Sequence, residues 1–454
     1  HRGDKRGRAC IRCRKWVSKR ELFIWIYRLI FAPFALLLSP KYLLKMKQRG
    51  DYEGAFSMRL GMGLEAWPKR EGHYRVWIQA VSLGEMLVIE SLLRKLASDD
   101  SIEIFLTTTT STGYRLAKER YSEICDRIVY FPLDFWPFSR RVWKHVQPDL
   151  AICAETELWP EHIQQALNSN TPMILVNGRL SDNSFRYARR LAFLFRSHFV
   201  GISRVLAISE HDAQRFEVIG VNRSKMVVTG NLKLDVSIGE RLGTSERAEM
   251  KARLGLGDGF VLLGSSTWPG EETMLLEAFK RLRKKLPKSR LMLVPRHAER
   301  RGEVRSLLES ASEGLNWHFR SEGDPFGDVD ILVGDTSGEL RVLTQLADLA
   351  FVGKSLAPHK EGQTPIECGL LGVPMVFGPG MNNFRSIRDG LLESGSAESL
   401  TDAEALKMRL VALALDDEAR EKQKRNQAIW VKNSRGALER TFEEIDKVLR
   451  QKGR

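Results

Sequence analysis

Two runs of alternating strand and helix patterns constrain the fold of this chain more than any other feature. In the first run, short apolar segments such as YRVWIQAVS (74–82) and IEIFLTTTT (102–110) each precede a segment with apolar residues at helical spacing. The alternation restarts at FVLLGSS (260–266) and continues past PMVFGP (374–379). Strands that alternate with helices predict βαβ units on a parallel sheet with helices on both faces. We therefore expect an α/β chain with two doubly wound lobes.

A polar, glycine-bearing interval near residues 235–250 separates the two runs. We assign residues 51–235 to an N-terminal Rossmann-like domain. Residues 236–454 then form a C-terminal Rossmann-like domain that ends in a helical tail. Ligands of such sheets bind at the carboxyl ends of the strands. We therefore expect the site in a cleft between the lobes.

The start of the chain is strongly basic. Residues 1–20 hold nine Lys or Arg residues against one Asp, so much of the net charge of +14 is concentrated there. Such a basic leader is attracted to anionic lipid. Nucleic acid is the competing partner, which we set aside because the chain has no zinc-finger, RNP or basic-zipper pattern. Cys10 and Cys13 form a lone C-x-x-C without the second ligand pair of a zinc site.

A nearly continuous apolar run, LFIWIYRLIFAPFALLL, occupies residues 22–38. A membrane-spanning helix needs about 20 apolar residues, and this run is slightly short and contains Arg28 and Pro33. A buried core helix is the alternative. Because the run is apolar all round and has cations on both flanks, we interpret residues 21–50 as an anchor that spans or lies in the membrane. The rest of the chain would then lie on the cytoplasmic face of the inner membrane.

Residues capable of chemistry follow the predicted strands. In the first lobe they include SLGE (82–85) and AETE (154–157), and in the second GSS (264–266) and PRH (295–297). A Gly-Ser-Ser before a helix offers N–H groups and a positive helix end to an anion, which predicts a phosphorylated ligand. Helix capping or a surface turn is the structural alternative for each motif. The chain has no Walker loop and no G-x-G-x-x-G, H-E-x-x-H or G-x-S-x-G motif. These absences argue against a P-loop NTPase, a dehydrogenase, a zincin and an α/β-hydrolase.

Many of these motifs, in order, resemble those of the 3-deoxy-D-manno-octulosonic acid (Kdo) transferases of lipopolysaccharide biosynthesis. The matching segments span residues 36 to about 384 and include WIQAVSLGE, TTTTSTG, PLDFWP, AETELWP, NGRLSDNSFRYARR, GSSTWPGEE, LVPRHAER, GDTSGEL, GKSLAPH and GPGMNNF. The resemblance implies a GT-B fold and an N-terminal membrane anchor. It also implies an inverting transfer from CMP-Kdo to a lipid A precursor.

The resemblance also implies roles for individual residues. Glu85 would be the catalytic base and Glu155 a second functional carboxylate. The residues expected to bind the CMP donor are Ser265, Ser266, Arg296, His297, Gly334, Asp335, Thr336, Gly338, Glu339 and, as a ribose ligand, Glu367. The residues expected to bind the acceptor are Ser82, Gly84, Arg179 and Arg186. Arg186 belongs to the basic stretch RYARRLAFLFRSH, which suits lipid phosphates but is also typical of a solvated helix.

An inverting transfer needs one base, which takes the proton of the acceptor hydroxyl as that oxygen attacks the anomeric carbon. A glycine before the base leaves room for the acceptor. We expect no metal ion and no cofactor, because no carboxylate cluster with metal-ligand spacing is apparent in the sequence.

The chain departs from the family pattern at three places. Gln79 occupies a position where the family usually has His, and Lys354 replaces the second Gly of the family's Gly-Gly pair. The segment HKEGQTPIE (359–367) is one residue longer than the family's motif. The last departure leaves open an alternative, a GT-B transferase that uses another nucleotide-sugar donor on a lipid-linked acceptor. A membrane-tethered protein that binds nucleotide-sugars without catalysis is the alternative outside enzymes, and the presence of Glu85 argues against it.

Overall fold

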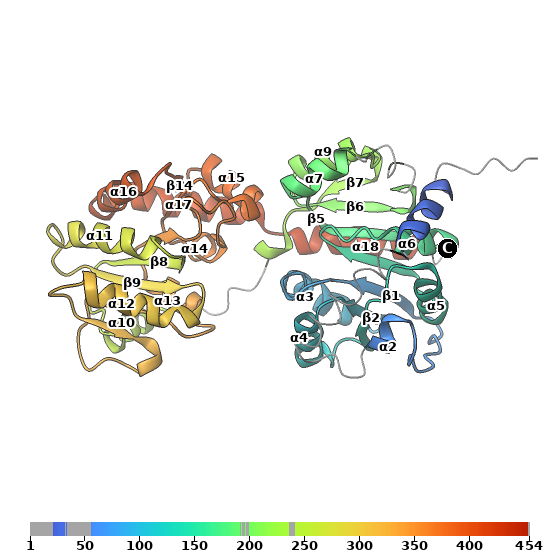
Figure 1. Cartoon of the computed structure of the whole chain (residues 1–454), viewed down its shortest axis with the longest axis horizontal. Coiled ribbons are helices and arrows are strands. Elements are labelled where there is room, and N and C mark those ends of the chain that lie inside the picture. The colour runs from blue at the N-terminus through green and yellow to red at the C-terminus, as the bar shows by residue number, and fades with distance from the viewer. Residues whose placement is uncertain are drawn as a thin grey trace, which may run out of the picture. The chain divides into compact units, whose positions relative to one another are not determined.

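The structure is a computed structural model that describes residues 21–31, 33, 56–190, 192, 196, 199–235 and 241–452. The chain divides into a first unit, His1–Thr229 with Glu439–Arg454, and a second unit, Gly230–Leu438. In Figure 1 each unit is a sheet with helices packed on its two faces. The predicted basic leader with Cys10 and Cys13, and residues 34–55, which include most of the predicted anchor, lie outside the described residues.

The first unit contains a seven-stranded sheet in the order β3-β2-β1-β4-β5-β6-β7, with parallel pairing throughout. Its strands are β1 (Tyr74–Gln79), β2 (Ile102–Thr108), β3 (Arg127–Tyr130), β4 (Leu150–Ala154), β5 (Met173–Gly178), β6 (Arg204–Ala207) and β7 (Met226–Val228). Its helices include α2 (Phe56–Arg59), α3 (Leu83–Ala97), α4 (Ser111–Tyr121), α5 (Trp136–Val146), α6 (Pro160–Asn168), α7 (Asp182–Arg190), α9 (Glu210–Ile219) and α18 (Ala437–Lys452).

The second unit repeats this plan with the order β10-β11-β9-β8-β12-β13-β14, again parallel throughout. Its strands are β8 (Val261–Thr267), β9 (Arg290–Pro295), β10 (Trp317–Phe319), β11 (Ile331–Val333), β12 (Leu349–Val352), β13 (Met375–Phe377) and β14 (Glu398–Ser399). Its helices include α10 (Thr244–Arg253), α11 (Glu271–Arg283), α12 (Arg301–Ala311), α13 (Leu340–Leu346), α14 (Ile366–Leu371), α15 (Arg385–Glu393), α16 (Ala403–Leu415) and α17 (Asp417–Ser434). The prediction of two parallel α/β sheets is confirmed.

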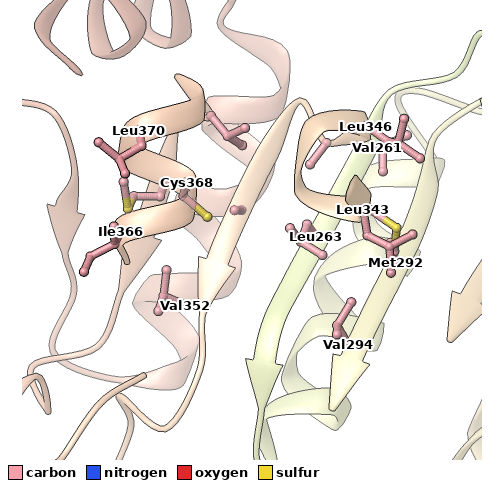
Figure 2. Close-up of a cluster of buried hydrophobic side chains, with 14 of the residues drawn as sticks. Val261, Leu263, Met292, Val294, Leu343, Leu346, Val352, Ile366, Cys368 and Leu370 are labelled. Atoms are coloured by element: carbon pink, nitrogen blue, oxygen red, sulfur yellow. The ribbon is translucent and has the colours of Figure 1, made fainter. Parts of the chain in front are cut away.

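The strands of the second unit are apolar on both faces because helices cover both. Along β8, Val261 and Leu263 point into one hydrophobic core, whereas Leu262 between them belongs to the core on the opposite face. Figure 2 shows the first of these cores, where side chains of β8, β9 and β12 meet those of α13 and α14. Burial on both faces explains why these strands are continuous apolar runs in the sequence.

The last helix, α18, belongs to the first unit and not to the C-terminal domain, which corrects our assignment of the whole tail. Its Ile445 is fully buried, Arg440 Nε donates to the carbonyl of Thr229 at 2.9 Å, and Glu439 pairs with Lys95. In Figure 1 the red α18 lies among the blue and green elements of this unit. The helical pattern of the tail predicts a helix but not which sheet it covers.

Residues 21–31 form a helix that packs one face on the first unit. On that face Phe23 and Ile24 are buried, and the Phe31 ring stacks on Phe135 with 5.6 Å between centroids. The opposite face is apolar and exposed, with Leu22, Trp25, Ile26, Leu29 and Ile30. Within the described part of the chain, no helix is both long and apolar enough to cross a membrane.

Candidate functional site

Glu85 lies in the first turn of α3, where it exchanges two hydrogen bonds with the N-cap residue Ser82. The Ser82 Oγ accepts a hydrogen bond from the Glu85 N–H at 3.4 Å, and the Ser82 hydroxyl donates to Glu85 Oε1 at 3.0 Å. Glu85 Oε2 accepts from the N–H of Val81 at 2.8 Å. A Ser followed three residues later by a Glu is the sequence signature of a capping box, but here the Glu accepts from the N–H of Val81, one residue before the N-cap. The carboxylate is therefore fixed to the end of β1 through both of its oxygens.

The space beside Glu85 is open on the side of Gly84. A Cβ atom built on Gly84 would meet only Ser82 Oγ, at 3.8 Å, within 4 Å. Gly84 is itself exposed. The structure therefore brings the predicted base and the predicted acceptor residues Ser82 and Gly84 together, and it leaves one approach to the carboxylate without a side chain.

Glu155 and Glu157 follow β4 and share the electrostatic environment of Glu85. Burial raises the pKa of Glu85, opposed by the Val81 N–H, and the charge of Glu155 raises it further. Burial, together with the charge of Glu85, raises the pKa of Glu157 to about 7. The Glu157 carboxylate also accepts from the indole N–H of Trp159 at 2.7 Å. Three acidic side chains therefore gather at the carboxyl ends of β1 and β4.

Arg179, at the end of β5, partly neutralises this cluster. Its Nε and Nη2 atoms lie 2.8 and 2.7 Å from Glu155 Oε2, and its charge lowers the pKa of Glu85. Glu155 is buried and has a left-handed backbone with φ of 54°, which few residues other than Gly adopt. By contrast, the structure places Arg186 on the exposed surface of α7. Arg179 is therefore joined to the cluster by a direct contact, and Arg186 has the environment of a solvated helix residue.

In the second unit, Trp268, which the sequence did not predict as a site residue, is the centre of a group of side chains that includes the predicted donor-site residue His297. Its ring packs against His297 and His359 with centroid distances of 5.5 and 5.1 Å. The Nζ atom of Lys354 lies 4.2 Å from the Trp268 ring centroid. These residues come from the loops after β8, β9 and β12. The only sequence signal for Trp268 is its place in the GSSTWP segment, directly after the strand.

Ser265 and Ser266 do not precede a helix, which corrects our interpretation of the Gly-Ser-Ser motif. Strand β8 continues through Thr267, and the carbonyl of Ser265 accepts the N–H of Gly353 inside the sheet. Helix α11 begins only at Glu271.

The first turn of α11 carries its own carboxylates. Glu271 accepts the N–H groups of Trp268 at 2.9 Å and Lys354 at 2.8 Å, and Glu272 accepts from the Thr267 hydroxyl at 2.7 Å. Both Glu side chains are buried. They place negative charge at the helix end that we expected to bind an anion.

Two acidic residues hold the loop between β11 and α13. Asp335 accepts from the N–H and hydroxyl of Ser321 at 2.9 and 2.6 Å and pairs with Arg301. Burial would raise the pKa of Asp335, but the Ser321 and Arg301 contacts outweigh it and lower that pKa. Both oxygens of Asp335 are therefore used within the protein.

The rest of that loop is more exposed. Glu339 accepts from Arg320 at 3.0 Å and from the Thr336 hydroxyl. Gly338 is exposed with φ of 88°, whereas Gly334 is buried, and a Cβ atom on it would lie 2.7 Å from Leu343. Only the tip of the loop, around Thr336 to Glu339, is therefore available to a ligand.

Arg296 and Glu367 form the remaining part of the predicted donor site. Burial raises the pKa of Glu367, whereas the Thr364 hydroxyl, at 3.2 Å, and the charges of Arg341 and Arg296 lower it. Arg296 is exposed after β9. The charge of Arg296 thus acts on the Glu367 carboxyl group, which lies in the first turn of α14. Among the described residues, no group of three or more His, Cys, Asp or Glu side chains is arranged to hold a metal ion.

Comparison with known proteins identifies the family. The family model of 3-deoxy-D-manno-octulosonic-acid transferases (kdotransferases) matches residues 55–236. A 3-deoxy-D-manno-octulosonic acid transferase of Haemophilus influenzae is 32% identical over 420 residues, which cover 91% of this chain and 94% of the relative. The chain belongs to the Kdo transferase family. The Kdo transferase of Bordetella pertussis is 31% identical over 383 residues, covering 82% of this chain and 86% of that protein.

Solved structures with low sequence identity support the fold of this Kdo transferase family member. A glycosyltransferase from Rickettsia africae has a TM-score of 0.56 at 14% identity and covers 83% of this chain and 99% of its own. A UDP-GlcNAc 2-epimerase from Neisseria meningitidis has a TM-score of 0.55 at 15% identity, with coverages of 83% and 100%. The two parallel α/β sheets are thus those of GT-B glycosyltransferases and related enzymes.

Proposed function

We propose that this chain transfers Kdo from CMP-Kdo to a hydroxyl of a lipid A precursor, with Glu85 as the base. Membership of the Kdo transferase family gives the reaction class, in lipopolysaccharide biosynthesis. The observation that carries the assignment of the base is the pair of hydrogen bonds from the Val81 N–H and the Ser82 hydroxyl. They hold the Glu85 carboxylate at the end of β1 beside an open approach over Gly84. A base must be fixed within hydrogen-bond reach of the proton that it removes.

The reaction forms a bond from the acceptor oxygen to the anomeric carbon of Kdo and breaks the bond from that carbon to the phosphate oxygen. Glu85 takes the proton of the acceptor hydroxyl, and CMP leaves with the bonding electrons. The raised pKa of Glu85 makes the carboxylate a stronger base while Arg179 limits the rise. The Glu155–Arg179 pair then sets the charge around the base, since both groups act on that pKa.

The departing phosphate monoester gains negative charge, which exposed cations of the second unit can stabilise. Arg296 follows β9 and acts on the Glu367 carboxyl group, our proposed ribose ligand. Preorganised charge of this kind lowers the barrier without moving during the reaction. Arg296 would thereby stabilise the leaving group while Glu85 activates the acceptor.

The helix of residues 21–31 supports a proposal about location. One of its faces is packed on the first unit, whereas Leu22, Trp25, Ile26, Leu29 and Ile30 are exposed on the other. Apolar side chains of a helix that lies in the interfacial plane insert into the acyl boundary of a bilayer. We propose that this face holds the chain on the cytoplasmic face of the inner membrane, where a lipid A precursor is accessible.

The direct test incubates the full chain in detergent with CMP-Kdo and a tetraacylated lipid A precursor and measures the product mass. We expect the addition of Kdo and the release of CMP. UDP-sugars offered in parallel test the alternative donor, and transfer from one of them but not from CMP-Kdo would replace the proposal. Release of CMP without a change in the lipid's mass would indicate hydrolysis instead of transfer.

A further inference from the structure

Lys354 has a strained backbone conformation at the end of β12. Its φ of 54° lies in the left-handed region, which residues with a Cβ rarely adopt. The strain is maintained from outside, because the Lys354 N–H donates to Glu271 Oε2 at 2.8 Å and its carbonyl accepts the N–H of Gly362 at 3.0 Å. Such strain is concentrated at functional sites, where it fixes the direction of a side chain. Gly would relieve the strain, so the retained Lys side chain requires a reason.

Among the described residues, the ammonium group of Lys354 has only weak partners. It lies 4.2 Å from the centroid of the Trp268 ring and 3.7 Å from Oε2 of Glu361, whose side chain is about half exposed. An ion pair with such an exposed partner contributes little to stability. Stabilisation of the fold is therefore a poor explanation for Lys354.

Trp268 provides an independent observation. Its Nε1 atom is buried, and within the described part of the chain it has no hydrogen-bond partner. An indole N–H can only donate, and a buried donor without an acceptor costs free energy. The Lys354 ammonium and the Trp268 N–H belong to two side chains in contact, and both can donate to the same group. An oxyanion is the ligand that such a pair of donors favours.

The position of Glu361 depends on the loop that differs from the family pattern. The N–H of Gln363 donates to the carbonyl of Gly353 at 3.0 Å, and the carbonyl of Glu361 accepts the N–H of Asn383 at 2.9 Å. These backbone bonds hold the longer HKEGQ segment against the end of β12. Two departures from the pattern, Lys354 and the extended loop, are therefore in contact with each other.

We infer that Lys354 and the Trp268 indole N–H form an anion-binding pair that takes an oxyanion of the nucleotide-sugar donor and displaces Glu361 from the ammonium. This inference rests on the proposed function for the identity of the donor. His297 and His359, whose rings pack on Trp268, belong to the same side-chain group. The oxyanion is either the phosphate of CMP or the carboxylate of Kdo, and both present the same chemistry to the pair.

The test uses the full chain in detergent and three variants, Lys354→Gly, Lys354→Met and Lys354→Arg. Calorimetry measures the binding of CMP and of cytidine, and steady-state kinetics measure the KM for CMP-Kdo. Lys360→Met is the matched control, since Lys360 is an exposed lysine of the same segment. Melting curves are recorded for every variant.

We expect the Gly and Met variants to weaken anion binding about 10- to 100-fold, the range of one charge-assisted hydrogen bond. If the phosphate is the ligand, CMP affinity falls and cytidine affinity does not. If the Kdo carboxylate is the ligand, CMP affinity is unchanged, the KM for CMP-Kdo rises and kcat changes little. Lys354→Arg should recover part of the loss in either case, and Lys360→Met should match the wild type.

Stability separates this role from a structural one. Lys354→Gly relieves the left-handed strain, so its melting temperature should not fall although donor binding weakens. Unchanged CMP affinity and unchanged KM, with a lower melting temperature, would overturn the inference. Failure of the wild type to transfer Kdo would instead contradict the proposed function, while the CMP titrations would still test Lys354.

Discussion

Arg179 donates through two guanidinium nitrogens to one oxygen of Glu155, at 2.8 and 2.7 Å. These two residues act on the pKa of Glu85 in opposite directions, because the charge of Glu155 raises it and that of Arg179 lowers it. The pair therefore sets the proton affinity of the proposed base from two different strands, β4 and β5. This arrangement makes the assignment of Glu85 testable by pH as well as by substitution.

The acid limb of the pH profile should move in opposite directions in two variants. The base must be deprotonated, so kcat/KM falls as the pH falls through the pKa of Glu85. Arg179→Gln removes a charge that lowers this pKa, so the limb should move to higher pH. Glu155→Gln removes a charge that raises it, so the limb should move to lower pH. Profiles of kcat/KM from pH 4 to 9 measure both shifts, and Arg186→Gln on α7 should leave the limb in place. Shifts in the same direction would exclude Glu85 as the titrating base.

Glu85→Gln should separate catalysis from helix capping. Gln can keep both side-chain contacts, with its amide oxygen accepting from Val81 and its NH₂ group donating to Ser82. We expect stability within about 0.5 kcal/mol of the wild type, and a loss of turnover of about 10²–10⁴-fold. Ser82→Ala is the reverse control, which should cost about 1 kcal/mol of stability and retain far more activity. Near-normal turnover in Glu85→Gln would exclude Glu85 as the catalytic base.

Arg28→Met should destabilise the first unit. Arg28 donates from Nε and Nη2 to the two oxygens of Glu161, both at 2.9 Å, and the Glu161 side chain has no exposed surface. Removing one partner of a buried pair costs about 3 kcal/mol, because the other charge stays buried. Denaturant unfolding measures the loss. Adding Glu161→Gln to Arg28→Met should recover part of it, and equal stability of the single variant and the wild type would contradict the role of this pair.

The exposed face of the N-terminal helix should control membrane binding. Leu29→Asp with Ile30→Asp places two charges on residues that are 77% and 60% exposed, so the fold should be unaffected. Sedimentation with anionic vesicles in high salt should show reduced binding, since hydrophobic insertion is not screened as surface charge is. Val218→Asp is the matched control, an exposed apolar residue of α9. Full retention of vesicle binding by the double variant would reject this face as the membrane contact.

Arg296→Ala should weaken CMP binding about 10- to 100-fold and leave cytidine binding nearly unchanged, because the variant lacks a charge-assisted contact to phosphate. It also removes a charge that lowers the pKa of Glu367, so that pKa should rise. Calorimetry with CMP and cytidine distinguishes a phosphate contact from a nucleoside contact. Lys288→Ala, an exposed lysine before β9, is the control. An equal loss for CMP and cytidine would assign Arg296 to the nucleoside.

The strand-helix alternation by itself determined most of the architecture. Strands such as β1 and β8 are covered on both faces, so each is a largely apolar run in the sequence. Such a run can be recognised without knowing which strands pair with it. The position of Glu85 was equally local, because its carboxylate is held by Ser82 and Val81, three and four residues earlier in the chain. Strands β10 and β14 were not predicted because neither is a continuous apolar run, since β10 reads Trp-His-Phe and β14 reads Glu-Ser.

Only the tertiary structure decided which charged, polar and aromatic side chains contact each other. Arg28 interrupts an apolar run and finds its partner, Glu161, 133 residues later in the chain. The Gly-Ser-Ser segment looks like a helix start, yet the sheet extends β8 through it and the Glu271 and Glu272 carboxylates occupy the first turn of α11. Lys354 likewise comes beside Trp268 only because β8 and β12 are neighbours in the sheet. Periodicity reports the burial of each residue, whereas ion pairs and ring contacts depend on how distant segments are paired.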